Sequence, residues 1–190
     1  ESEVGIEVLV IGNDAYNIKG MPYDGVLSNC VTDAKAVKKA LQKLGARCRL
    51  LKNVESIRTL EDSVSAWAEE RLSKNVRIAF LFWAGHALSH RGETNLLPTF
   101  SRSDPASTET LKVGRDTLSL RDLISLVRKV NLKCTIEVAL DSCRNEVKIK
   151  DATFGCTDGA KGKDAADNGS VDIIYSTAYG ITADDNSPFK

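Results

Sequence analysis

The chain has 190 residues, with 26 Lys and Arg against 26 Asp and Glu, so its formal net charge is zero. This length fits one domain that can bury a sizeable core without disulfides or a structural metal. The composition is 42% hydrophobic and 27% charged, which excludes a disordered chain. Balanced charge without a long basic run predicts no nucleic-acid partner. No apolar run of about 18 residues and no basic-then-apolar leader are present, which predicts a cytoplasmic protein without a membrane partner.

Five cysteines are spread along the chain without any CxxC spacing, at Cys30, Cys48, Cys134, Cys143 and Cys156. Only two histidines, His86 and His90, could join them in a zinc site, so we predict no metal and no cofactor. The odd number and wide spacing fit a disulfide framework poorly, which favours reduced thiols. The cysteines at 30, 48 and 134 fall within helix or strand patterns and are expected in the core.

Short apolar runs alternate with helical periods along the chain. We predict strands over Ile6–Ile11, Arg47–Leu51, Arg77–Ala84, Cys134–Leu140 and Asp172–Ser176. We predict helices over Asn29–Leu44, Leu60–Leu72 and Leu120–Val130. The run RIAFLFWA at 77–84 is apolar on both faces, which is typical of a central strand in a parallel sheet. This order predicts an α/β fold, a mostly parallel β-sheet with helices on both faces.

Residues 146–170 differ from the rest, because Lys, Asp, Gly and Ala dominate them without a usable period. A loop of about 25 residues in a compact domain is more often functional or mobile than structural. We therefore divide the chain into a first segment at 1–145, a linker at 146–170 and the start of a second segment at 171–190. The chain ends without an evident final element, which indicates a larger parent chain.

Two predicted strands end in residues that can carry chemistry. The strand at 77–84 runs into Gly85-His86-Ala87, and the strand at 134–140 runs into Asp141-Ser142-Cys143. Because the carboxyl ends of parallel strands meet at one edge of a sheet, the imidazole of His86 and the thiol of Cys143 are expected to lie close together. A thiolate, a base and backbone N–H donors are what cysteine hydrolysis requires, and the N–H groups of Ala87 and Cys143 are candidates for these donors.

A structural interpretation stands beside the catalytic one. A single cysteine at a strand end is usually a small buried hydrophobe, and a histidine after a glycine is usually a turn residue. Their occurrence at matching strand ends brings the two interpretations about level. His90, in a hairpin-like stretch, is a weaker alternative base because a flexible loop positions a proton acceptor poorly. Cys156 has no assigned role.

Six segments resemble the caspase-like cysteine peptidases, the clan of caspases, metacaspases and paracaspases. In order they are VLVIGNDAY (8–16), LSNCVTDAKAVKKAL (27–41), FLFWAGHA (80–87), NLLP (95–98), ALDSCRN (139–145) and YSTAYGITADDNSPF (175–189). The resemblance implies a cysteine endopeptidase with His86 as base and Cys143 as nucleophile. It also makes 1–145 the large catalytic segment, 146–170 the linker and 171–190 the start of the small segment.

The resemblance further assigns a specificity pocket. It places Asp33 and Asp141 around the substrate side chain before the scissile bond, with Asp185 or Asp184 as a further wall, and in metacaspases and paracaspases such acids select Arg or Lys. A carboxylate pair holds a guanidinium in bidentate fashion. For Asp33 the alternative is a first-turn charge favoured by the helix dipole. With an acidic pocket, four lysines of the linker become candidate self-cleavage sites, although for any single one a solvated lysine-rich loop is the favoured interpretation: Lys148, Lys150, Lys161 and Lys163.

The chain departs from the clan at three points. Ala87 stands where the family usually has glycine, DSCRN is not the QACRG-type motif of caspases, and Leu88–Thr94 holds a single acid, so we predict no calcium site. The chain therefore resembles paracaspases or bacterial caspase homologues more than it resembles caspases proper or calcium-dependent metacaspases. The expected partners are Arg- or Lys-containing peptides or proteins, with a homodimer possible. Two alternatives are a catalytically silent scaffold or signalling module and, less favoured because no Gly-rich phosphate loop follows the first strand, a flavodoxin-like nucleotide-binding domain.

Overall fold

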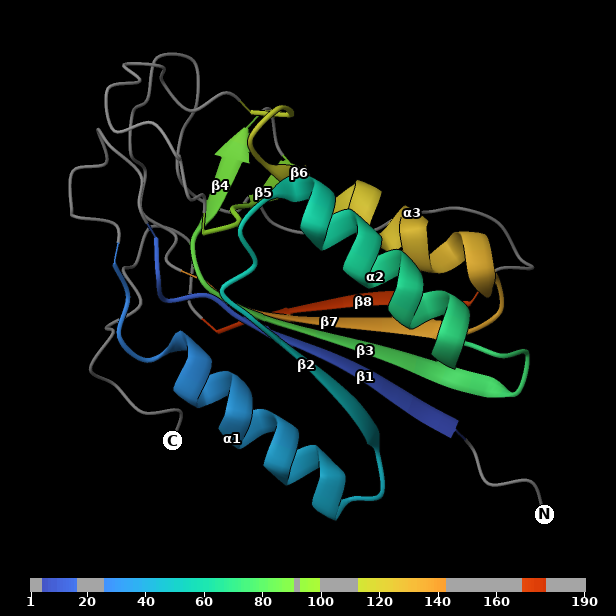
Figure 1. Cartoon of the computed structure of the whole chain (residues 1–190). Helices are drawn as coiled ribbons and strands as arrows, with labels where there is room; N and C mark the ends of the chain where they lie inside the picture. The colour runs from blue at the N-terminus through green and yellow to red at the C-terminus, as the bar shows by residue number, and fades with distance from the viewer. Residues whose placement is uncertain (1–4, 17–25, 91–92, 100–112, 143–168, 177–190) are drawn as a thin grey trace.

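The computed structural model describes residues 5–16, 26–90, 93–99, 113–142 and 169–176, and Figure 1 shows their arrangement. Five strands form one sheet in the order β2-β1-β3-β7-β8, and its four strand pairings are parallel. The strands are β1 (Gly5–Gly12), β2 (Arg47–Lys52), β3 (Val76–Ala84), β7 (Thr135–Asp141) and β8 (Val171–Tyr175). The predicted parallel α/β sheet is confirmed, with β3 at its centre.

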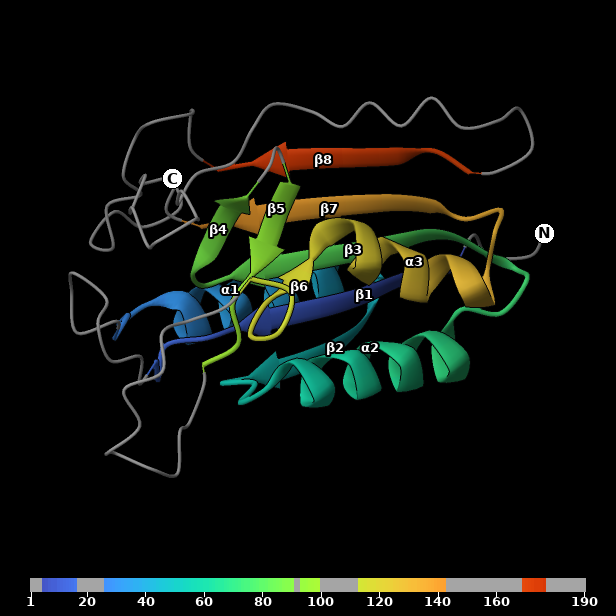
Figure 2. The same ribbon diagram turned by 90° about the horizontal axis from the view of Figure 1, so that it is seen from above.

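Helices cover both faces of this sheet. Figures 1 and 2 show α1 (Cys30–Lys43) on one face, with α2 (Ile57–Arg71) and α3 (Leu120–Val130) on the other. The alternation of faces follows from right-handed crossovers, since the chain moves in one direction across the sheet from β1 to β2 and in the other from β2 to β3 and β7. Helix α2 starts earlier than predicted because the Ser56 side chain accepts a hydrogen bond from the Thr59 N–H and caps the helix there.

A second, smaller sheet lies over the carboxyl ends of the main strands, as Figure 2 shows. It is antiparallel, in the order β4-β5-β6, and consists of β4 (Ala87–His90), β5 (Glu93–Leu96) and β6 (Leu118–Ser119). Of this sheet the sequence predicts only the hairpin-like turn between β4 and β5. Its importance for the site is that β4 begins at the residue after His86.

The core has one layer on each side of the main sheet. The larger cluster packs between the sheet and helices α2 and α3 and includes Leu9, Trp67 and Ile136, which are fully buried. The smaller cluster lies under α1. Full burial of an aliphatic side chain contributes roughly 1.5–3 kcal/mol, so the two layers make the sheet a rigid base for its carboxyl edge. Of the three cysteines predicted in the core, those at 30 and 134 are buried, whereas that at 48 is half-buried on the edge strand β2.

Candidate active site at the carboxyl edge of the sheet

The strands that lead to His86 and Cys143 end side by side. Ala84, the last residue of β3, is paired with Asp141, the last residue of β7. The Gly85 N–H then donates a hydrogen bond to the Asp141 carbonyl at 3.1 Å, so the contact continues beyond the strands. His86 follows Ala84 by two positions, and Cys143 follows Asp141 by two positions. Cys143 itself lies outside the described residues.

The backbone of His86 is held on both sides by hydrogen bonds. Its N–H donates to Oη of Tyr16 at 2.7 Å, and its carbonyl accepts from the N–H of Leu97 at 3.1 Å. The Tyr16 hydroxyl in turn donates to the Leu97 carbonyl at 3.1 Å. The Tyr16 ring also contacts the half-buried imidazole, with the ring centroids 4.4 Å apart and the planes inclined by 56°.

Gly85 creates the space in which this arrangement fits. Its φ of +153° is unfavourable for any residue with a side chain. A Cβ atom at this position would lie 2.3 Å from Oη of Tyr16 and 3.2 Å from Cβ of Asn13. Glycine is therefore required both for the change of direction between β3 and β4 and for the close approach of Tyr16.

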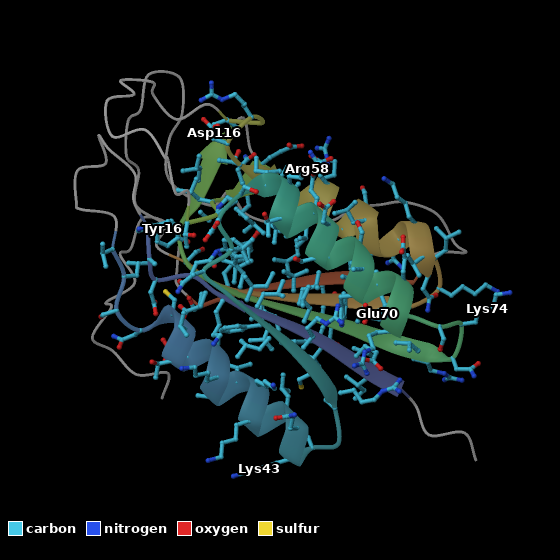
Figure 3. The ribbon with its side chains drawn as sticks, viewed as in Figure 1. Tyr16, Lys43, Arg58, Glu70, Lys74 and Asp116 are labelled. Carbon is cyan, nitrogen blue, oxygen red and sulfur yellow. The ribbon has the colours of Figure 1, made fainter. Side chains whose placement is uncertain are left out.

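The Tyr16 phenol remains protonated at neutral pH. Its side chain is 2% exposed, and burial raises the pKa of Tyr16 well above its ordinary value of 10. The hydroxyl can therefore donate to Leu97 while it accepts from His86. Figure 3 shows Tyr16 at the opposite end of the sheet from Glu70 and Lys74, among the carboxyl ends of the strands.

The N–H of Ala87 is not used by the ladder between β4 and β5. Ala87 is paired with Leu96, and the adjacent bond from the Leu97 N–H to the His86 carbonyl makes this a non-hydrogen-bonded pair of the antiparallel ladder. The Ala87 N–H is consequently directed away from β5, at the edge of the small sheet. An oxyanion donor requires a backbone N–H that is directed out of the secondary structure in this way.

Two of the four predicted pocket acids lie at the same edge and on the same face of the sheet. Asp33 is in the first turn of α1 and is half-buried. The helix lies directly on β1, because a Cβ atom at Gly12 would be 2.7 Å from Cβ of Ala34. Asp141 is two positions beyond Ala139, which packs in the cluster under α1, so its side chain is on the α1 face.

Asp141 also has a partner that sequence reasoning missed. The hydroxyl of Ser176, the residue after β8, donates to Oδ1 of Asp141 at 2.8 Å, and the Ser176 N–H donates to the Leu140 carbonyl at 3.0 Å. The sequence predicts Ser176 as the last residue of the strand, whereas β8 ends at Tyr175 and Ser176 follows it. The remaining candidates lie outside the described residues: Asp184, Asp185, Lys148, Lys150, Lys161 and Lys163.

The Asn13–Tyr16 segment, which follows β1, connects several parts of the site. The Asp14 carboxylate accepts the Val31 N–H at the start of α1, with 3.2 Å to each oxygen. Oδ1 of Asn53, a residue with φ of +48°, accepts the N–H groups of Asp14 and Ala15 at 2.8 and 3.2 Å. The side-chain oxygen of Asn13 accepts the N–H of residue 54 at 2.9 Å. One segment thus fixes both the start of α1 and the position of Tyr16.

A separate cavity of about 480 Å³ lies between α2, the start of α3 and the small sheet. Its lining includes Glu61, Glu93 and Asp122. Arg121 forms an ion pair with Glu93, and the Ser119 hydroxyl donates to Asp122 at 2.7 Å. Two of the three carboxylates are therefore already partnered within the protein, and this cavity is distinct from the His86 edge.

Neither a metal cluster nor a membrane span is found in the part of the chain that the structure describes. Among these residues, no three or more His, Cys, Asp or Glu side chains are grouped so that they could hold a metal ion. The helices within the same ranges are too short or too polar to cross a membrane.

Comparison with known proteins gives one family and one fold. The sequence profile of the caspase domain matches residues 7–189. The crystal structure of a protein from Geobacter sulfurreducens is similar with a TM-score of 0.50 and 23% sequence identity, and the match covers 73% of this chain. This chain spans 50% of the length of that protein, and at this identity the likeness shows the fold alone. No curated protein sequence matches the chain.

Proposed function

This chain belongs to the caspase-domain family of cysteine peptidases, and we propose that it is an endopeptidase that cleaves after Arg or Lys through Cys143 and His86. The observation that carries the proposal is the pairing of Ala84 with Asp141 and its continuation in the bond from Gly85 to Asp141. This pairing supports the approach of the imidazole and the thiol, because each follows its paired strand residue by two positions.

The proposed reaction has two halves, formation of a thioester on Cys143 and its hydrolysis, and each half includes two proton transfers. The His86 imidazole accepts the proton of the Cys143 thiol, and the thiolate attacks the carbonyl carbon of the peptide bond. His86 then protonates the amine as the peptide bond breaks, which leaves a thioester on Cys143. Water attacks this thioester while His86 accepts the water proton, and the proton returns to the sulfur as the acid product departs.

The N–H groups of Ala87 and Cys143 would stabilise the oxyanion that forms in both halves of this reaction. The position of Ala87 in a non-hydrogen-bonded pair supports this role, because its N–H is not used by the β4–β5 ladder. Loss of one such donor typically costs about 10²–10³ in kcat. The methyl group of Ala87 is accommodated in the fold, since the residue is 4% exposed within β4.

Specificity for Arg or Lys would come from Asp33 and Asp141, with Asp185 or Asp184 as a further wall. The shared face and edge of the first two acids support this pocket. Two carboxylates at a partly desolvated site hold a guanidinium through parallel charge-assisted hydrogen bonds. The bond from Ser176 to Asp141 would orient one carboxylate for this contact.

Hydrolysis of peptidyl-aminomethylcoumarin substrates tests the proposal. The full chain is expected to hydrolyse substrates that end in Arg or Lys in preference to one that ends in Asp. Cys143→Ala should abolish turnover, whereas Cys48→Ala, which changes a half-buried thiol on the far edge strand, should retain it. Wild-type turnover no greater than that of Cys143→Ala would reject the peptidase and favour a silent scaffold.

A second pair of variants tests the pocket. Asp33→Ala should lower kcat/KM for arginyl substrates by about 30- to 1,000-fold, the equivalent of about 2–4 kcal/mol for a lost partner of a buried charge. The matched control is Asp62→Ala, which removes an exposed carboxylate from α2. If both variants lose the same activity, the assignment of Asp33 is wrong. Fragments of the purified wild type that end at a linker lysine would indicate self-cleavage.

A further inference from the structure

We propose that Tyr16 is a positioning residue for His86, because its hydroxyl fixes the histidine backbone and its ring restricts the imidazole. The proposal rests on the peptidase function proposed above. It assigns a role in the reaction to a tyrosine that does not touch the substrate and that is 70 positions from the histidine in the sequence.

A closed ring of hydrogen bonds surrounds the backbone of His86. The N–H of His86 donates to Oη of Tyr16 at 2.7 Å, the hydroxyl donates to the Leu97 carbonyl at 3.1 Å, and the Leu97 N–H donates to the His86 carbonyl at 3.1 Å. Both polar backbone groups of His86 are therefore engaged, and the phenol is the side-chain member of this ring. The Tyr16 hydroxyl therefore fixes the N–H side of the His86 backbone, from whose Cα the imidazole projects.

The Tyr16 hydroxyl has very little freedom to move. Tyr16 is 2% exposed, and its Oη lies next to the Cα of Gly85, where an added Cβ atom would be only 2.3 Å away. The same added Cβ atom would be 3.2 Å from Cβ of Asn13 and 3.4 Å from Nε1 of Trp83, so the surroundings are closely packed. In such a site, a hydrogen bond that is removed is not replaced by one to solvent.

The aromatic rings of Tyr16 and His86 are in direct contact. With centroids 4.4 Å apart and planes inclined by 56°, the phenol ring is in van der Waals contact with the imidazole. Because two hydrogen bonds hold the hydroxyl of Tyr16, its ring cannot move away, and its contact with the imidazole limits the rotation of the imidazole. A base that already lies in the reactive orientation loses less entropy when it accepts the thiol proton.

Tyr16 is itself anchored away from His86. The N–H of Tyr16 donates to the Asp14 carbonyl at 2.8 Å, and Asn53 accepts the N–H groups of Asp14 and Ala15. The anchor thus lies at the ends of β1 and β2, while the group it positions lies at the end of β3. A tyrosine that served only the core would not need to contact the backbone of the predicted base.

Tyr16→Phe tests the proposal, because it keeps the ring and removes the hydroxyl. We expect kcat to fall about 10- to 100-fold with KM within about twofold, and the imidazole proton signals of His86 in NMR spectra to broaden or shift. These signals are assigned by their loss in His86→Ala. The control, Ser125→Ala, also removes one side-chain hydroxyl, here from an exposed residue of α3 whose hydroxyl donates to the Arg121 carbonyl, and should leave kcat and the His86 signals unchanged.

The outcomes separate this proposal from the peptidase function. Tyr16→Phe with wild-type kcat and wild-type His86 signals would overturn the positioning role. A wild type without turnover would reject the peptidase, and the NMR signals would still test whether Tyr16 restrains the imidazole. A third measurement needs no variant: the His86 amide should exchange with deuterium as slowly as amides within β3, and exchange as fast as in an open loop would also overturn the proposal.

Discussion

Replacement of Gly85 by alanine tests the packing on which the candidate site depends. The new Cβ atom would lie 2.3 Å from Oη of Tyr16, a distance that real Cβ atoms essentially never show. The Tyr16 hydroxyl cannot retreat without breaking its bonds to His86 and Leu97. The substitution is therefore expected to displace the His86 backbone as well as to destabilise the fold.

The magnitude follows from two independent costs. A residue with a side chain in the backbone region of Gly85, at φ of +153°, costs about 1–3 kcal/mol. An inserted methyl group in a closely packed site costs about 1–3 kcal/mol more. Gly45→Ala is the matched control, because Gly45 has φ of +87° with nothing within 4 Å of the added atom, so only backbone strain of about 1–2 kcal/mol applies.

Urea unfolding of the two variants measures this difference, and peptide hydrolysis measures its effect on the site. We expect Gly85→Ala to lose about 1–3 kcal/mol more free energy of unfolding than Gly45→Ala. It should also lose most of its kcat, while Gly45→Ala keeps wild-type kinetics. Equal losses of stability in the two variants, or a wild-type kcat in Gly85→Ala, would refute the close approach of Tyr16.

Three further predictions concern stability and reactivity. Asp14→Ala removes the acceptor for the Val31 N–H and should cost about 0.5–2 kcal/mol in urea unfolding; an unchanged midpoint would contradict this cap. Burial raises the pKa of Glu7 above its ordinary value of 4.5 against the opposing charge of Arg47, so the folded state binds this proton more tightly than the unfolded state. The stability that this proton contributes is complete below about pH 4.5 and is lost as the pH rises through the folded pKa. Glu7→Gln should therefore make the free energy of unfolding decline less steeply with pH. The same slope in the variant and the wild type would contradict a raised pKa of Glu7. Cys134 is 0% exposed and burial raises its thiol pKa, so iodoacetamide at about pH 8 should label it only in urea; labelling of the native chain, read by peptide mass spectrometry, would show that the core opens there.

The sequence predicts the main sheet well because each element has a strong local signal. The run at 77–84 is apolar on both faces and forms the central strand, and the helix predicted over 29–44 is found at Cys30–Lys43. The small sheet has no such signal, since its strands contain four, four and two residues. Its formation depends on pairing between distant residues, such as Asn95 with Ser119, which no local pattern contains.

The candidate site likewise has one part that the sequence predicts and one part that it does not. The sequence predicts that His86, which follows β3, and Cys143, which follows β7, come at the same edge of the sheet. This prediction needs only the topological rule for parallel sheets and no knowledge of side chains. The bond between Tyr16 and the His86 N–H joins a side chain to a backbone group across 70 positions, so no periodicity or spacing could indicate it. The one signal in the sequence was the motif GNDAY itself, whose Asn, Asp and Tyr are too polar for a simple continuation of a buried strand.

The Asn13–Tyr16 segment gives the two halves of the proposed site a common support. Asp14 holds the start of α1, on which Asp33 lies, and Tyr16 holds the backbone of His86. The proposed substrate pocket and the proposed base are therefore positioned by one short segment rather than by separate loops. The distance between the pocket and the base decides where the scissile bond lies relative to the nucleophile. A shared support keeps this distance constant, so that a substrate bound in the pocket is also correctly placed for proton transfer.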